Sequence, residues 1–283
     1  MDIKNVCVIG AGIMGSGIAQ LLATHGINVN LVDVSDDILR KVKEVIDKNL
    51  QKFYVDKNKI SKEEAERILN RINLLVNKDE AIKDAQMVIE AVFEDMELKQ
   101  NLFADLDAQC EKDVILASNT SSLRITDMAT KSINQERIIG IHFFNPAPVM
   151  KLIELIKGKK TSDEIVEKSK KFSESLDKTV VTVNDTPGFV TTRLIYVLCN
   201  EAINLLAQGI ASAEDIDTAC KLAFNFPIGP LELSDLVGND IYDHIGLYLE
   251  KELGNNYQPS PLLRKMAREG LLGRKSGKGF YEY

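Results

Sequence analysis

A glycine-rich turn set between two short apolar runs limits the folds open to this chain more than any other stretch. Residues 6–9 are Val-Cys-Val-Ile, a run typical of a parallel strand buried on both faces. A G-x-G-x-x-G follows at 10–15 and opens a segment with helical periodicity, and a second strand is predicted at 28–33. A flexible turn would explain the glycines alone. Strand, glycines, helix, strand and a terminal acid in this order predict a dinucleotide-binding unit.

The chemistry of such a unit gives a role to each of its marked residues. Gly10, Gly12 and Gly15 allow a tight turn, close approach of the backbone to a pyrophosphate, and close packing of the helix. The N-terminus of that helix supplies N–H donors and positive potential for the phosphates. Asp33 is expected to accept hydrogen bonds from a ribose and to repel a 2′-phosphate, and Val34 rather than Arg follows it. The predicted cofactor is therefore NAD and not NADP.

Strands and helices continue to alternate after this unit. A charged helical hairpin is predicted as an insertion at 35–73, with a helix start at 61–64. Further elements are a helix at 94–110 and buried strands at 85–93, 114–117, 137–141 and 179–183. This alternation predicts an α/β fold, a Rossmann-type doubly wound parallel sheet with helices on both faces.

The alternation stops near Asn184, and only helical patterns follow. These lie at 189–208, 213–224, 231–253 (with interruptions) and 261–269. The predicted domains are therefore 1–184, an NAD-binding Rossmann domain, and 185–283, an all-helical substrate and dimerisation domain. The helix at 189–208 is apolar over much of its circumference, so it is expected to pack centrally in its domain or against a second subunit. A homodimer is the hypothesis that follows.

Polar side chains come directly after three of the predicted strands. They are Glu94, the Ser-Asn-Thr-Ser-Ser of residues 118–122, and His142. Ligands of open parallel sheets sit beyond the carboxyl ends of the strands, so these groups are expected at the ligand edge. The polar loop at 118–122 fits equally well as an ordinary loop that caps the next helix.

His142 and Glu154 lie in an apolar strand-turn-strand passage that Pro146 and Pro148 interrupt, so they can meet only across a turn. A carboxylate beside a histidine fixes the ring tautomer and stabilises the protonated ring, which is a general-base arrangement. The alternative is a hydrogen-bonded core histidine and an edge-strand carboxylate.

Composition excludes several classes of partner and site. The net charge is -7 and tryptophan is absent, which disfavours binding to nucleic acid or to anionic membranes. The four cysteines have no C-x-x-C spacing and no nearby histidine, so neither a metal site nor a disulfide framework is predicted. No apolar run approaches the roughly 18 residues of a membrane span, and no targeting segment is predicted at the start. A cytoplasmic protein is expected.

One segment departs from this acidic balance. Between residues 40 and 71, ten basic residues stand against six acidic ones. A solvated helical hairpin accounts for most of these side chains, and a docking surface for an anionic ligand arm is the functional alternative.

Several motifs together identify a family. They are Gly-Ala-Gly-Ile-Met-Gly-Ser-Gly-Ile-Ala-Gln at 10–20, Val-Ile-Glu-Ala-Val-Phe-Glu at 88–94, Ser-Asn-Thr-Ser-Ser at 118–122, His-Phe-Phe-Asn-Pro at 142–146, Asp-Thr-Pro-Gly-Phe at 185–189, Phe-Pro-Ile-Gly-Pro at 226–230, and Gly-Lys-Gly-Phe-Tyr at 277–281. Over essentially its whole length the chain resembles the L-3-hydroxyacyl-CoA dehydrogenase family, and its compact length is most similar to the bacterial 3-hydroxybutyryl-CoA dehydrogenases. The first motif is widespread. The His-Phe-Phe-Asn-Pro passage followed by Glu154, together with Ser-Asn-Thr-Ser-Ser, is specific.

The resemblance implies an activity and a set of site residues. The expected reaction is reversible hydride transfer between NAD and C3 of an L-3-hydroxyacyl-CoA, a step of fatty acid and butyrate metabolism. His142 is then the catalytic base and Glu154 its orienting partner, and Ser121 and Asn145 contact substrate or nicotinamide. The resemblance also assigns to the NAD site Met14, Asp33, Ala91, Glu94, Lys99, Asn119 and Lys275. The implied acyl-CoA partner is an anionic ligand for which the basic excess of residues 40–71 could be the docking surface.

One residue departs from the family pattern. After Pro-Gly-Phe-Val the family usually has Asn-Arg, with the Asn reaching the substrate, whereas this chain has Thr192 before Arg193. Threonine offers one hydroxyl where an amide offers a carbonyl and an NH₂ group. Two alternatives therefore stay open: an NAD-dependent dehydrogenase of a hydroxy acid without CoA, and a non-catalytic NAD-binding relative.

Overall fold

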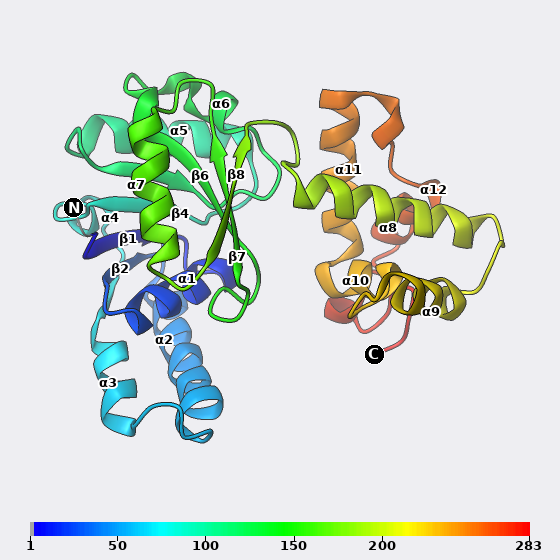
Figure 1. Ribbon diagram of the computed structural model, residues 1–283, viewed down its shortest axis with the longest axis horizontal. Coiled ribbons are helices and arrows are strands. Elements are labelled where there is room, and N and C mark those ends of the chain that lie inside the picture. The colour runs from blue at the N-terminus through cyan, green and yellow to red at the C-terminus, as the bar shows by residue number, and fades with distance from the viewer. Residues whose placement is uncertain (1–2) are drawn as a thin grey trace. The chain divides into compact units, whose positions relative to one another are not determined.

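The first part of the molecule is built on one mixed sheet (Figure 1). The computed structural model describes residues 3–283. The strand order is β3-β2-β1-β4-β5-β6-β7-β8. The strands are β1 (Asn5–Ile9), β2 (Asn28–Val32), β3 (Ile72–Leu75), β4 (Met87–Glu90), β5 (Ile115–Ser118), β6 (Ile138–Phe143), β7 (Leu152–Lys157) and β8 (Thr179–Asn184).

Strands β1 to β6 are all parallel, as the alternation of strands and helices predicts. β7 runs antiparallel to β6, because the short connection between them cannot carry the chain back to the same end of the sheet. β8 follows a helix and is parallel to β7. The predicted doubly wound Rossmann-type sheet is thus confirmed, with two added strands that reverse direction.

Helices cover the sheet (Figure 1). The core of one face joins α1 (Ile13–Thr24), the hairpin helices α2 (Asp36–Leu50) and α3 (Lys62–Asn70), and α7 (Asp163–Glu174). α5 (Met96–Gln109) packs against β5, and α6 (Ile125–Met128) packs against β6. α4 (Lys78–Ala81) is a single turn beside β2 and β3.

The insertion between β2 and β3 is a helical hairpin, as predicted. Ser35 and Ser61 cap its two helices, since their hydroxyls accept from the amides of Asp37 and Glu64, each at 3.2 Å. A π-helical turn at Gln51–Val55 ends the first helix. β3 and α7 are elements that no sequence pattern predicted. β3 has four residues, and α7 sets Ile165, Val166 and Phe172 among charged residues.

The contacts of the chain form two compact units, one ending at Asp185 and one running from Thr186 to Tyr283. The second unit is helical, as predicted. Its helices are α8 (Thr191–Ala207), α9 (Ala213–Phe224), α10 (Pro230–Val237), α11 (Asn239–Leu253) and α12 (Pro261–Arg268). Gly238, with a φ of +116°, separates α10 from α11, which explains the interruption expected in the segment 231–253. The core of this unit gathers around Tyr196, Ile203 and Leu249.

Two findings bear on the classes of site and partner. Among residues 3–283, no helix is both long enough and apolar enough to cross a bilayer. In the same range, no three His, Cys, Asp or Glu side chains are grouped so that they could hold a metal ion. Cys7, Cys110, Cys199 and Cys220 are free thiols.

Candidate functional site

The glycine turn fits a dinucleotide because each glycine is required for a different reason. Gly10 has a φ of +99°, and a Cβ on it would lie 2.5 Å from the Ala91 carbonyl oxygen. A Cβ on Gly15 would lie 1.7 Å from the Gly10 carbonyl oxygen. At Gly12, by contrast, no atom of the described chain lies within 4 Å of the added Cβ. The first and third glycines serve the packing of the chain, and the second faces open space that a pyrophosphate can enter.

Asp33 joins the end of β2 to this turn. Its Oδ2 accepts from the Ala11 amide and its Oδ1 from the Val34 amide, each at 2.7 Å. The carboxylate is partly exposed and stands one residue beyond a buried strand. A carboxylate held in this way beside the turn is suited to a ribose, so the residues present fit NAD.

A buried cation lies between two carboxylates at the end of β4. The Lys99 ammonium is 2.6 Å from Glu90 Oε1 and 3.2 Å from Glu94 Oε2, and the Lys99 side chain is 1 % exposed. Burial alone would lower the pKa of Lys99, but the two carboxylates raise it, so the ammonium is retained. Burial raises and the Lys99 charge lowers the pKa of Glu94, and the net direction is downward. Glu94 is therefore ionised.

Glu94 in turn organises the polar loop after β5. Its Oε1 accepts from the Thr120 hydroxyl at 2.5 Å, from the Ser121 amide at 3.1 Å and from the Ser122 amide at 3.3 Å. The Ser121 hydroxyl lies 3.5 Å from the same oxygen. The loop is thus fixed by a carboxylate from the connection between β4 and α5, which is a tighter arrangement than a helix cap alone.

His142 and Glu154 meet across the β6–β7 pair. They are direct partners in the antiparallel register, and His142 Nδ1 lies 2.9 Å from Glu154 Oε2. The His142 side chain is 8 % exposed and that of Glu154 is 1 % exposed. The imidazole also packs at 4.4 Å, centroid to centroid, from the Phe144 ring. This geometry fixes the ring and places a carboxylate where it can stabilise a proton on it.

Two asparagines lie near the His142–Glu154 pair, Asn119 through a bond to the residue after His142 and Asn145 in the loop that follows. Asn119 Oδ1 accepts from the Phe143 amide at 2.9 Å, so the end of β5 is tied to the end of β6. Asn145 follows in the loop after β6 and is exposed. Within the described part of the chain its side chain has no hydrogen-bond partner, which leaves its amide available to a ligand.

The structure therefore brings most of the predicted residues to one edge. These residues lie at the carboxyl ends of parallel strands that are neighbours in the sheet. The turn at 10–15, Asp33, and Ala91 with Glu94 follow β1, β2 and β4, the loop 118–122 begins at the last residue of β5, and His142 is the last but one residue of β6. Met14 lies in the first turn of α1. Lys99 lies beneath Glu94 rather than on the surface.

Thr192 and Lys275 belong to the second unit. Thr192 is in the first turn of α8 and is 9 % exposed. Lys275 lies in the turn Arg274–Ser276, and its ammonium is 2.5 Å from Asp240 Oδ1.

Two residues of the carboxylate network, Glu90 and Ser118, were given no individual role from the sequence. Glu90 is 0 % exposed and also accepts from the Ser118 hydroxyl at 2.7 Å. Glu90 reads as part of a buried strand and Ser118 as part of a polar loop, and only the pairing of β4 with β5 brings them together.

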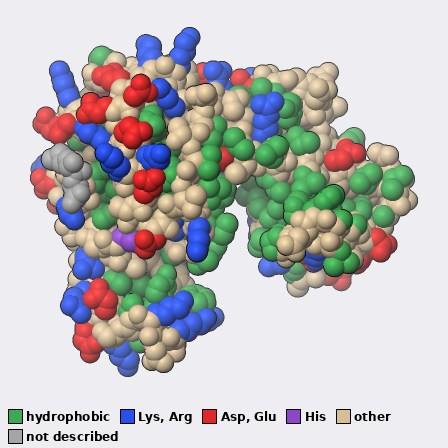
Figure 2. All heavy atoms as spheres, in the orientation of Figure 1, with side chains coloured by type: hydrophobic (Ala, Val, Ile, Leu, Met, Phe, Trp, Pro, Cys, Tyr) green, Lys and Arg blue, Asp and Glu red, His purple; other side chains and the backbone are tan. Residues whose placement is uncertain are grey.

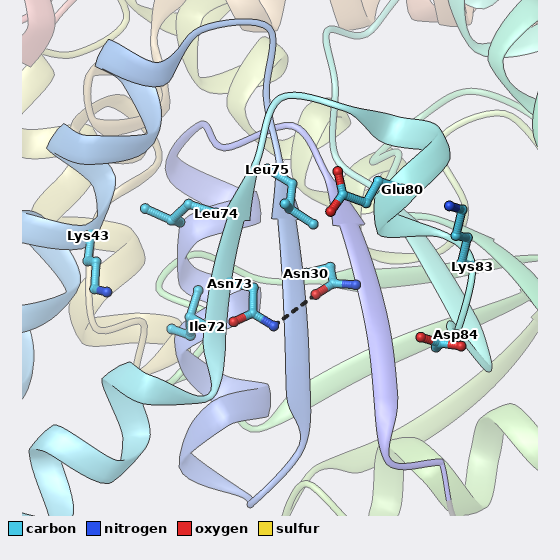
Figure 3. A pocket seen from close by; sticks show the side chains of 9 residues that line it. All are labelled: Asn30, Lys43, Ile72, Asn73, Leu74, Leu75, Glu80, Lys83 and Asp84. Atoms are coloured by element: carbon cyan, nitrogen blue, oxygen red, sulfur yellow. Dashed lines mark hydrogen bonds between the residues drawn. The ribbon is translucent and has the colours of Figure 1, made fainter.

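A cavity of about 700 Å³ lies elsewhere, at the free edge of the sheet formed by β3 (Figure 3). Asn73 of β3 donates to Asn30 of β2 at 3.2 Å, and Lys43 and Lys83 line opposite sides of the strand. Its lining includes Lys43 of the basic segment 40–71, but none of the residues predicted individually for catalysis or for NAD. The predicted site is thus an open strand-end edge rather than this hollow.

Comparison with known proteins gives the same family over both units. The model of the 3-hydroxyacyl-CoA dehydrogenase NAD binding domain matches residues 5–186, and that of the 3-hydroxyacyl-CoA dehydrogenase C-terminal domain matches residues 188–283. A 3-hydroxybutyryl-CoA dehydrogenase of Clostridioides difficile is 43% identical over 98% of this chain and 99% of its own. The human mitochondrial hydroxyacyl-coenzyme A dehydrogenase is 42% identical over 99% of this chain and 91% of its own.

A solved structure is similar as well. The crystal structure of (S)-3-hydroxybutyryl-CoA dehydrogenase from Ralstonia eutropha is 40% identical and superposes with a TM-score of 0.94. The match covers 100% of this chain and 99% of that one.

Proposed function

Because the chain belongs to the 3-hydroxyacyl-CoA dehydrogenase family, we propose that it acts on short-chain substrates, 3-hydroxybutyryl-CoA and acetoacetyl-CoA, with His142 as general acid and base. The class of reaction is the NAD-dependent interconversion of 3-hydroxyacyl-CoA and 3-ketoacyl-CoA. The observation that carries the assignment of His142 is its 2.9 Å contact with the buried Glu154, at the sheet edge that also bears the glycine turn.

His142 moves the proton of the reaction. When bound, NAD would supply the hydride acceptor for oxidation at C3 and the hydride donor for reduction. During oxidation the imidazole takes the hydroxyl proton as the C3–O bond becomes a carbonyl, and during reduction the imidazolium gives that proton to the oxygen. Glu154 holds Nδ1, so the proton exchange is assigned to Nε2 on the other side of the ring.

Polar groups on either side of His142 orient the substrate in this proposal. The Ser121 hydroxyl and the exposed Asn145 amide are the donors assigned to the C3 oxygen and the nicotinamide. Thr192 is assigned to the substrate, with one hydroxyl in place of the usual amide. The geometry of Glu94 and its loop supports this role of Ser121, because the carboxylate accepts from the Ser121 amide and so fixes its backbone.

The remaining parts of the proposal concern the CoA arm, the assembly and the compartment. Figure 2 shows Lys and Arg side chains on the helical hairpin, and the basic excess of residues 40–71 is the proposed dock for the phosphates of CoA. A homodimer is proposed because apolar side chains of the second unit are exposed, among them Leu194 and Leu222. The compartment proposed is the cytoplasm.

The test is substrate-dependent NADH consumption by the wild type and by His142→Gln. We expect turnover of acetoacetyl-CoA but not of free acetoacetate, and a kcat lowered by about 10²- to 10⁴-fold in the variant. NADH binding, followed by fluorescence, should not change, because the glycine turn is intact. His244→Gln, at an exposed histidine of α11, is the matched control. A His142→Gln enzyme with near-normal kcat would remove His142 from the chemistry.

A further inference from the structure

The loop between β6 and β7 places Asn145 directly after the strand that bears His142. It spans residues 144–151, and Pro146 and Pro148 lack the N–H groups that could close it by backbone bonds. The amides of Val149 and Met150 both donate to the Pro146 carbonyl, at 2.9 and 3.0 Å, and make a single tight turn. Among the described residues of the turn only the Pro146 carbonyl accepts a backbone bond from within it, so donors for the other carbonyls must come from elsewhere in the fold.

A buried lysine supplies them. Lys178, in the turn between α7 and β8, donates from Nζ to the carbonyls of Ala147 at 2.8 Å and Met150 at 2.7 Å. Lys178 is 8 % exposed and Ala147 is 2 % exposed. An ammonium has three donors, so it can bind both carbonyls at once, the buried one of Ala147 and the partly buried one of Met150.

Neighbouring elements enclose the loop on two further sides. The Thr179 amide, next to Lys178, donates to the Lys151 carbonyl at 2.7 Å. On α1, a Cβ added to Gly17 would lie 3.5 Å from the Ala147 Cβ and 3.7 Å from Pro148, so the helix backbone closes on the loop. The loop thus rests on α1, β8 and the Lys178 ammonium.

We propose that Lys178 is a positioning residue of the dehydrogenase: its two bonds to the Ala147 and Met150 carbonyls hold the turn that presents Asn145 beside His142. This inference rests on the proposed roles of His142 and Asn145. It assigns a catalytic consequence to a residue that makes no contact with the reacting groups.

The charge of the Lys178 ammonium predicts that kcat depends on pH. Burial lowers the pKa of Lys178, and Asp177 on the same turn opposes this shift. Asp177 itself faces His25, the residue after α1, with 3.5 Å between Oδ2 and Nε2. The loop binds Lys178 through carbonyls. The ammonium is present below its lowered pKa and is lost as pH rises through it. The charge-assisted bonds then weaken.

The experiment compares wild type, Lys178→Met, Lys178→Arg and the control Lys171→Met, an exposed lysine of α7. For Lys178→Met we expect kcat with acetoacetyl-CoA to fall by about 10- to 100-fold, with NADH affinity unchanged. The wild type should lose kcat at alkaline pH, and Lys178→Arg should lack that loss because a guanidinium keeps its proton. Lys171→Met should match the wild type in every respect.

Hydrogen exchange separates this proposal from the proposed function. Exchange at the Val149 and Met150 amides should accelerate in Lys178→Met, whether or not the protein turns over any substrate. A wild type without acetoacetyl-CoA reductase activity would count against the proposed function alone. A folded Lys178→Met with wild-type kcat and exchange would overturn the role of Lys178. If Lys178→Met fails to fold, an alkaline loss in Lys178→Arg equal to that of the wild type would overturn it.

Discussion

At the residue scale, the Glu154 carboxylate fixes one ring nitrogen of His142. It is 1 % exposed and lies 2.9 Å from Nδ1. Replacing it by a neutral amide in Glu154→Gln keeps the volume but removes the charge that stabilises an imidazolium. We expect kcat to fall by about 100-fold or more, and the pH profile of kcat to shift.

The measurement is kcat for NADH-dependent reduction of acetoacetyl-CoA across a pH series. Glu174→Gln is the control, since Glu174 ends α7 and is exposed. If Glu154→Gln kept both the magnitude and the profile of kcat, the pair would be a packing feature of β6 and β7 and not a catalytic dyad.

Individual site residues differ in how far the sequence could predict them. The pairing of His142 with Glu154 was predictable, because two prolines between two apolar runs indicate a turn that brings the runs together. The burial of Lys99 beneath Glu94 was not, because it depends on how α5 packs against the sheet. Its assignment to the cofactor site stays a prediction.

At the element scale, the sequence predicts the central strands of the sheet better than the edge strand β3. Runs such as residues 6–9 are apolar throughout, and this identifies central strands. β3 lies at the edge, where only Ile72 is buried, so its pattern is weak. The reversal at β7 is indicated by the two prolines of the turn and not by apolar periodicity.

A buried ion pair fixes where β6 begins. Asp107 of α5 accepts from Arg137 at 2.8 Å and from the amides of Ile133 and Asn134 at 2.7 and 3.0 Å. Both charged side chains are 3 % exposed. β6 starts at Ile138, directly after Arg137. This contact therefore fixes the start of the strand that carries His142.

Asp107→Asn tests this anchor. Removing one charge leaves Arg137 buried without its counter-ion, and we expect the free energy of unfolding to fall by about 3–5 kcal/mol. Burial raises the pKa of Asp107, but bonds from Asn134 and Arg137 lower it, and the net direction is downward. The stabilisation is therefore present above the unfolded pKa of about 3.9, and is lost as pH falls through the lower folded value.

Urea denaturation at neutral and acid pH, followed by circular dichroism, measures both effects. The control is Asp113→Asn, at an exposed position after α5. A loss of stability below about 0.5 kcal/mol, within the usual range of surface substitutions, would show that the ion pair does not anchor β6.

At the scale of the whole molecule, the second unit carries more apolar surface than its own core uses. On α8, Tyr196 and Ile203 are buried, whereas Leu194 is 68 % and Val197 46 % exposed. On α9, Leu222 is 81 % exposed and Phe224 61 %. Figure 2 shows hydrophobic side chains over much of the visible face of this unit, where α8 and α9 lie. Exposed apolar surface of this kind is typical of a subunit interface.

The proposed homodimer follows from that surface, and Leu194→Glu tests it. Leu194 and Val197 are three residues apart on α8 and so share a face of the helix. A carboxylate in the centre of an apolar interface is buried without a counter-ion, so we expect the variant to sediment as a monomer where the wild type sediments as a dimer. Ile133→Glu, at a position 91 % exposed in the first unit, is the control and should remain dimeric. A Leu194→Glu protein that stays dimeric would place the interface elsewhere.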